Sequence, residues 1–320
     1  MEVKTKENNN NITILNNIKS KFLLKEIFQN LTQKKFLQLV KYNKNIQKRL
    51  DININTFKKF FEEIEIELIP LKEIKDKKNT KFINIQKDLS SHYHIYFDYD
   101  KNEIKRNYLI SDEKIRKIKI ILDEEIKSFK GLFQECIIIE KIKFIKFNRK
   151  DITDMSFMFS GCTSLKEINL SNFKTNNVNN MSYMFSGCAS LISLNLFNFN
   201  TNKVTNLFGM FQSCSSLIEI DLNNFNTDNV TDMAFMISFC SLLKIVNISK
   251  FNTEKVIHLD FMFNECGSLE IIDVSNFKIN KDADMTCMFS ECHETLQNKI
   301  RFQNKNIKVE AFEKVYYPIS

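Results

Sequence analysis

The chain has 320 residues, enough for one large or two medium domains with a sizeable core. Its net charge of +7 is unevenly placed: residues 1–50 hold 11 Lys/Arg against 3 Asp/Glu, whereas residues 151–300 hold 9 Lys against 16 Asp/Glu. No apolar run approaches the length of about 18 residues that a membrane-spanning helix needs, and the polar residues 1–11 exclude a signal peptide of the usual type, so we expect a cytoplasmic protein.

Residues 1–12 are predicted to be a disordered tail, and residues 13–63 a basic helical region with apolar residues at helical spacing. The stretch 22–50, FLLKEIFQNLTQKKFLQLVKYNKNIQKRL, resembles an F-box. That resemblance implies that residues 20–50 bind a ubiquitin-ligase adaptor. The early proline and the late aromatic residue of the motif are missing, and a plain helical pair is the alternative.

Residues 64–122 alternate apolar and polar side chains, which is typical of strands, and we predict that 64–115 form an α/β cap. Ile118 and Ile120 are expected to belong to the first strand of a repeat region over 116–300. His92 and His94 fall on one side of a predicted strand as a candidate metal pair, but no further ligands stand at a recognisable spacing.

The repeat region is defined by a column of cysteines at intervals of 26 residues: Cys136, Cys162, Cys188, Cys214, Cys240, Cys266 and Cys292. Apolar residues stand seven, four and three positions before each column cysteine. This spacing predicts one buried stripe of a short helix, with Asn, Asp and Thr residues as its N-terminal caps. A fixed period of this length indicates a stack of repeats.

After each column cysteine the period changes, and the pattern Leu-x-x-Ile-x-Leu predicts a short strand. A polar segment follows, beginning at a phenylalanine that we expect to stack inside the repeats: Phe147, Phe173, Phe199, Phe225, Phe251 and Phe277. Each unit is therefore predicted to be a strand, an arch and a helix.

The unit NVTDMxxMFxxCxSLxxLxLxNFxT resembles the BspA-like (DUF285) leucine-rich repeats over about 126–296. The resemblance implies an α/β leucine-rich-repeat-type solenoid with a parallel sheet, behind the helical N-terminal region. Residues 301–320 are predicted to form a C-terminal cap, with a helix at 307–317. Many BspA-like proteins are thought to be cell-surface adhesins, which is one alternative function.

The cysteine column has three interpretations. Zinc needs clustered ligands, and only Cys287, Cys292 and His293 lie close together in sequence. Disulfides are not expected in a reducing compartment. Our prediction is that the cysteines are small core residues at a close approach between repeats, without a metal or a cofactor.

No catalytic motif is present, so we expect a protein-binding scaffold rather than an enzyme, with no nucleic-acid partner. The predicted strands present two outward columns, five and seven residues after each column cysteine. The first column varies, from the polar Glu167 to the apolar Ile271, as a binding surface could. The second is uniformly Asn or Asp, which is typical of a polar ladder. The candidate partner-binding residues are Glu167, Asn169, Ser193, Asn195, Glu219, Asp221, Ile245, Asn247, Ile271 and Asp273.

Overall fold

A computed structural model describes residues 18–20, 43–50, 62–73, 79–98 and 100–314. The chain divides into two compact units, Met1–Glu63 and Ile64–Ser320. In the first unit, the described residues contain helix α4 (Lys44–Leu50), which buries Ile46 and Leu50. Most of the F-box-like stretch and of the predicted helical region 13–63 lies outside the described residues, so both stay predictions. Among the described residues, no helix is long and apolar enough to cross a membrane.

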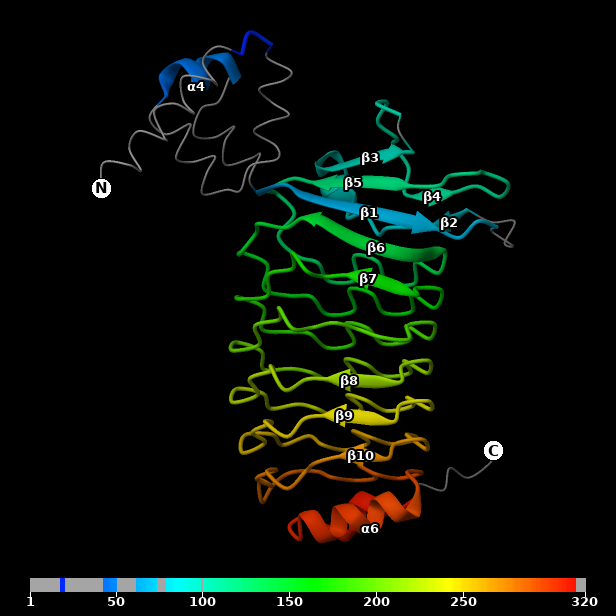
Figure 1. The fold of residues 1–320 in the computed structure, drawn as a ribbon, viewed down its shortest axis with the longest axis vertical. Coiled ribbons are helices and arrows are strands. Elements are labelled where there is room, and N and C mark those ends of the chain that lie inside the picture. Colours follow the sequence, from blue (N-terminus) through cyan, green and yellow to red (C-terminus); the bar gives the residue numbers. More distant parts are fainter. Residues whose placement is uncertain (1–17, 21–42, 51–61, 74–78, 99, 315–320) are drawn as a thin grey trace. The chain divides into compact units, whose positions relative to one another are not determined.

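The second unit begins with a mixed five-stranded sheet in the order β3-β5-β1-β6-β7 (Figure 1). Its strands are β1 (Ile64–Pro70), β3 (Tyr93–Phe97), β5 (Ile118–Leu122), β6 (Ile139–Lys146) and β7 (Glu167–Asn169). A small pair, β2 (Thr80–Lys81) and β4 (Tyr108–Leu109), and a 3-10 helix, η1 (Lys87–His92), lie between them in sequence. Alternate residues of β1, β3 and β5 are buried, because a strand turns successive side chains to opposite faces.

The junction between this sheet and the repeats is β6, which pairs antiparallel with β1 and parallel with β7. The expectation that Ile118–Leu122 is the first repeat strand is wrong, because β5 pairs antiparallel with β1 and β3. Further along, β8 (Glu219–Asp221), β9 (Ile245–Asn247) and β10 (Ile271–Ile272) form a three-stranded parallel sheet.

The predicted fold class, an α/β leucine-rich-repeat-type solenoid with a parallel sheet, is contradicted. The sheets are small and the largest one is mixed, with antiparallel pairs at its N-terminal side. The parallel strands are also interrupted, because residues 193–195, which stand between β7 and β8 in the repeat, form no strand. Within the described part of 64–293 the structure contains no α-helix.

The predicted helices are replaced by successive tight turns. Some backbone N–H groups of these turns donate within their own repeat, and others donate to the next repeat. The Met158 N–H donates to the Met155 carbonyl at 3.3 Å, whereas the Phe157 N–H donates to the Ser182 carbonyl of the next repeat at 2.9 Å. Phe157 is left-handed, with φ of 58°. A helix sends every N–H four residues back along its own chain, so it forms no such bonds to a neighbouring repeat. Apolar spacing is the same in both structures, which explains the wrong prediction.

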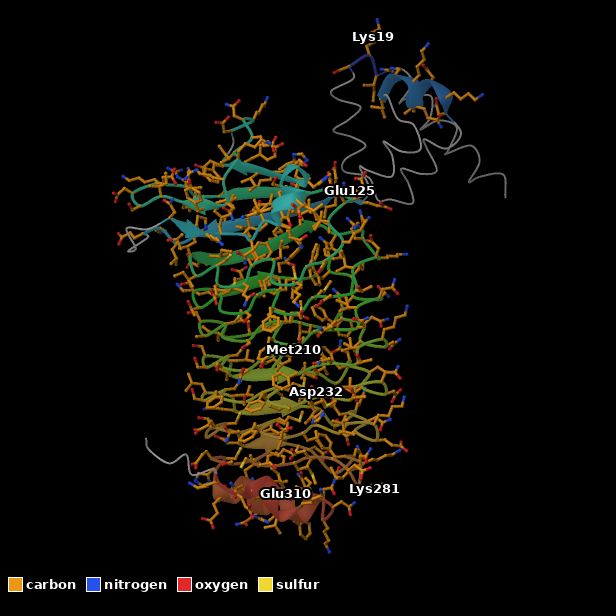
Figure 2. The ribbon with its side chains drawn as sticks, turned by 180° about the vertical axis from the view of Figure 1, so that it is seen from behind. Lys19, Glu125, Met210, Asp232, Lys281 and Glu310 are labelled. Carbon is orange, nitrogen blue, oxygen red and sulfur yellow. The ribbon has the colours of Figure 1, made fainter. Side chains whose placement is uncertain are left out.

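Bonds between repeats recur at every 26-residue step. The residues eight positions before the column cysteines form a ladder of isolated parallel bridges, from Asp154 to Asp284. The threonine hydroxyls of the polar segment donate to carbonyls of the next repeat at 2.9–3.0 Å, at Thr175, Thr201, Thr227 and Thr253. Met210 is buried inside this arrangement and Asp232 is half-buried at its side (Figure 2).

The column cysteines are fully buried apart from Cys292, which is 6% exposed, and the thiols are free. From Cys162 onward each Sγ donates to a carbonyl of the preceding repeat, 29 residues earlier, at 3.0–3.2 Å. Burial raises the pKa of the Cys162 and Cys214 thiols to about 12, so these groups are neutral donors. The cysteine therefore supplies a hydrogen bond as well as a small side chain.

Aromatic side chains stack in columns along the repeats. Phe173, Phe199 and Phe225 are buried, with ring centroids 5.7 and 6.3 Å apart. A second, half-buried column not expected from the sequence has centroids 4.7–5.6 Å apart, at Phe157, Tyr183, Phe208, Phe235 and Phe261. Gly209 takes the place of the ring in one repeat, because a Cβ there would lie 2.7 Å from the Tyr183 ring.

The two ends of the repeats are closed by different devices. At the first repeat, Arg149 stands where later repeats have threonine, and its buried guanidinium donates to the carbonyls of Asp123 and Ile126. At the other end, helix α6 (Glu294–Gln303) and the 3-10 helix η2 (Val309–Phe312) follow the last repeat. The predicted capping helix at 307–317 is wrong over its described residues, where only the short η2 forms.

Candidate functional site

The strand face is the surface formed by the outward side chains of β7 to β10 and of residues 193–195. All ten predicted partner-binding residues lie on it, exposed or half-buried. Register aligns them in columns, since Glu219 pairs with Ile245 and Ile245 with Ile271. Their outward position follows from the period of two in a strand, and their binding of a partner stays a prediction.

The Asn/Asp column has a structural task. The Oδ1 atoms of Asn169, Asn195, Asp221 and Asp273 each accept a hydrogen bond from the backbone N–H two residues later, at 2.9–3.1 Å. Such Asx turns explain why the column is uniformly short and polar. The remaining amide and carboxylate atoms are held in fixed positions at the end of each strand.

The variable column, five residues after each cysteine, changes character along the repeats. Glu167 forms an ion pair with Lys141 at 2.7 Å. The structure shows no ion pair for Glu219 within its described residues, and it is followed by the aliphatic Ile245 and Ile271. Ile271 is 55% exposed, so the polar-to-apolar change is present on the surface.

Sequence reasoning missed two exposed isoleucines that stand next to the variable column. Ile192 and Ile218 precede the variable column by one position and are 55% and 46% exposed. The Ile218 N–H donates to the Ile192 carbonyl at 3.3 Å, so the two residues are adjacent across the repeats. We call Ile192, Ile218, Ile245 and Ile271 the isoleucine strip.

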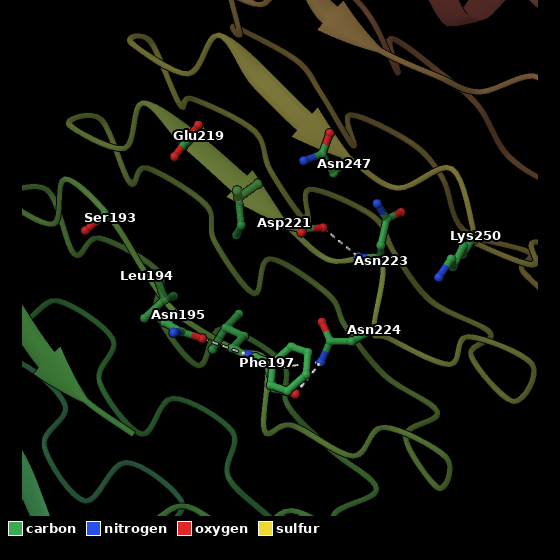
Figure 3. A pocket seen from close by; sticks show the side chains of 12 residues that line it. Ser193, Leu194, Asn195, Phe197, Glu219, Asp221, Asn223, Asn224, Asn247 and Lys250 are labelled. Carbon is green, nitrogen blue, oxygen red and sulfur yellow. Dashed lines mark hydrogen bonds between the residues drawn. The ribbon is translucent and has the colours of Figure 1, made fainter. Parts of the chain in front are cut away.

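Two hollows lie over the strand face, beside the isoleucine strip. The larger, of about 530 Å³, is lined by residues including Asn195, Phe197, Asp221 and Lys250 (Figure 3). The smaller, of about 440 Å³, shares Asn195 and Phe197 with it. Phe197 is 80% exposed and was not predicted, although the other repeats have no aromatic residue at its position.

The other candidate ligands do not converge. His92 Nδ1 lies 2.8 Å from an Asp123 oxygen, whereas His94 Nδ1 lies 3.2 Å from a Glu103 oxygen. His293 accepts the Thr295 N–H and caps α6. Across the described residues, no group of three or more His, Cys, Asp or Glu side chains is placed to hold a metal ion.

Comparison with known families gives one match. The family model described as "Mycoplasma protein of unknown function, DUF285" matches residues 127–245 and 218–317. Together these ranges cover more than half of the chain. No curated protein and no solved structure matches it.

Proposed function

The chain belongs to the DUF285 family, and from the geometry of its strand face we propose that it is a non-enzymatic protein-binding module. The partner contacts the isoleucine strip, together with Glu219 beside it. This proposal concerns the second unit alone and names no partner.

The observation that carries the proposal is the exposure of the isoleucine strip. Aliphatic side chains on the outward face of a strand lose their hydration cost when a partner covers them, at roughly 25 cal/mol per Å². Large exposed apolar patches on soluble proteins mark interaction sites. Glu219 lies at the edge of the strip, and its carboxylate has no ion-pair partner among the described residues. It therefore adds a polar contact that can orient the partner.

Two further features support a binding role without a reaction. His92 and His94 each lie beside a different carboxylate, and the thiols whose pKa rises to about 12 are not nucleophiles. The repeats are tied to each other through backbone, threonine and cysteine hydrogen bonds. A rigid surface of this kind loses little conformational entropy when it binds.

The test is affinity purification from the native cell with the full chain and two single variants. Ile218→Asp places a charge in the strip, whereas Ile257→Asp is the matched control, because Ile257 is 40% exposed but lies outside the strand face. We expect specific partners to be lost with Ile218→Asp and kept with Ile257→Asp. Partners that survive Ile218→Asp, with both variants folded, contradict the proposal.

A further inference from the structure

Because the repeats share one pattern, a residue that departs from it stands out. Two positions depart from the pattern beside the hollows. Nine residues after the column cysteine, the repeats have Ile145, Ser171, Phe197, Asn223, Ser249 and Ser275. Phe197 is thus the single aromatic residue of its column, and its ring is 80% exposed. An exposed ring adds nothing to the core, so packing does not explain it.

The next position, ten residues after the column cysteine, departs from the pattern two repeats later, after Cys240. Asn172, Asn198, Asn224 and Asn276 donate from Nδ2 to backbone carbonyls of the preceding repeat at 2.9–3.2 Å. Lys250 stands in this column, as Lys146 does in the first repeat, and has no amide group to make the bond. The repeat whose lysine lines the larger hollow therefore lacks the hydrogen bond that the asparagine repeats make to their preceding repeat.

Both departures meet at the hollows. Phe197 lines both hollows, and Lys250 lines the larger one (Figure 3). The same place is where strand pairing stops, at residues 193–195 between β7 and β8. Two irregularities of an otherwise regular repeat, the exposed Phe197 and the interrupted strand pairing, thus coincide beside Lys250, which indicates a ligand site.

The lining is suited to a ligand that carries many hydroxyl groups. Asn195 and Asp221 are fixed by their Asx turns at 3.0 and 3.1 Å, which leaves the Asn195 Nδ2 and the second Asp221 oxygen for a ligand. Lys250 adds a donor. A hydroxyl group donates and accepts at once, so it can bond to both kinds of atom. The larger hollow holds the carboxylates of Glu219 and Asp221 and one ammonium group, that of Lys250, and the smaller holds Glu167, so an anionic ligand is disfavoured.

The spacing of the site selects the form of the ligand. Neighbouring repeats stay in contact across the interruption, where the Ile218 N–H donates to the Ile192 carbonyl at 3.3 Å. Parallel neighbours in a sheet are about 4.8 Å apart, close to the rise of one pyranose unit in an extended β-(1→4)-linked chain. The apolar C–H face of a pyranose packs on an exposed ring such as Phe197. We propose that the two hollows form a groove that binds an extended, uncharged β-(1→4)-linked oligosaccharide, with one sugar face against Phe197.

The test is saturation-transfer NMR and calorimetry of the full chain with cellotetraose and tetra-N-acetylchitotetraose. Maltotetraose, whose α-(1→4) linkage curls the chain, is the stereochemical control. We expect binding of at least one β-(1→4) probe and at least about tenfold weaker binding of maltotetraose. Failure of both β-(1→4) probes to bind at about 10 mM, or equal binding of maltotetraose, overturns the inference.

Variants connect any binding to the groove. Phe197→Ser and Lys250→Asn install residues that other repeats carry at these positions, so both should fold, which thermal melting checks. We expect Phe197→Ser to weaken probe binding about tenfold and Lys250→Asn about threefold. Phe302→Ser, at a ring that is 85% exposed on α6, is the control and should leave binding unchanged. Binding unaffected by Phe197→Ser refutes the site.

The same variants separate this inference from the proposed function. Loss of saccharide binding with protein partners retained supports the groove and leaves the isoleucine strip intact. If Phe197→Ser instead removes a protein partner while no probe binds the unaltered chain, the hollows belong to the protein-binding face and the saccharide inference fails.

Discussion

Replacing Arg149 by methionine tests how the first repeat is closed. Its guanidinium is 2% exposed and donates to the Asp123 carbonyl at 3.1 Å and to the Ile126 carbonyl at 2.9 Å. It also bonds Asp151 at 2.6 and 2.7 Å. Later repeats have threonine at this position, whose hydroxyl is too short to reach back to these two carbonyls.

The magnitude follows from the two carbonyls that Arg149 bonds. The Ile126 carbonyl is left without a donor, which costs about 1–3 kcal/mol, whereas the Asp123 carbonyl keeps a weaker bond from the Ile126 N–H at 3.4 Å. The Asp151 side chain is 46% exposed and can be hydrated, so its pair with Arg149 contributes at most about 1 kcal/mol. We therefore expect Arg149→Met to lower the free energy of unfolding by about 2–4 kcal/mol. Lys150→Met, at an exposed neighbour, is the matched control and should change it by less than about 0.5 kcal/mol.

The assay is urea unfolding followed by circular dichroism, combined with hydrogen exchange. Exchange should accelerate around residues 123–130 and stay unchanged in the distant repeats, because each repeat contacts only its neighbours. The Arg149 hydrogen bonds lower the pKa of Asp151. Its contribution is therefore present above the ordinary aspartate pKa of about 3.9 and is lost as the pH falls through the lower folded value. A fully stable Arg149→Met variant, or one with unchanged acid sensitivity, refutes this account.

Three further predictions concern the repeats. Cys188→Ala should lower the free energy of unfolding in denaturant by about 1–2 kcal/mol, and Cys188→Ser should lower it less because serine keeps a donor. Cys188→Phe should unfold the repeats by overpacking. A metal or disulfide lost with Cys188→Ala would contradict the structural role. Burial, with a smaller contribution from the Asp284 charge, raises the pKa of Asp260, so ionisation at neutral pH is disfavoured in the folded state. Asp260→Asn should therefore raise the melting temperature at pH 7, and this gain should vanish below the ordinary aspartate pKa. A gain independent of pH would exclude this cause. Gly209→Ala, with φ of 57° and the Tyr183 ring 2.7 Å from the added Cβ, should cost about 1–3 kcal/mol, whereas Gly267→Ala, with 3.8 Å of room, should cost less than 1; equal costs would show that ring contact is unimportant.

The strand face could be predicted in outline from the sequence. Alternation after each column cysteine placed Glu167 and Ile271 outward, and the structure has both at the surface. The isoleucine strip was not predicted in full, because Ile192 and Ile218 stand one residue before the segment in which apolar and polar residues alternate. Phe197 and Lys250 are visible as departures in an alignment of the repeats, but only the structure shows that they line one hollow.

The sequence by itself determined the 26-residue period, the buried columns and the polar segments between them. Those features follow from residue type and spacing, which the chain carries locally. Only the tertiary structure decided between helices and turns, because apolar spacing is the same in both and the choice depends on whether N–H groups bond within a repeat or to its neighbour. The antiparallel pairing of β6 with β1 and the closure by Arg149 were decided there too, since both join residues far apart in the chain.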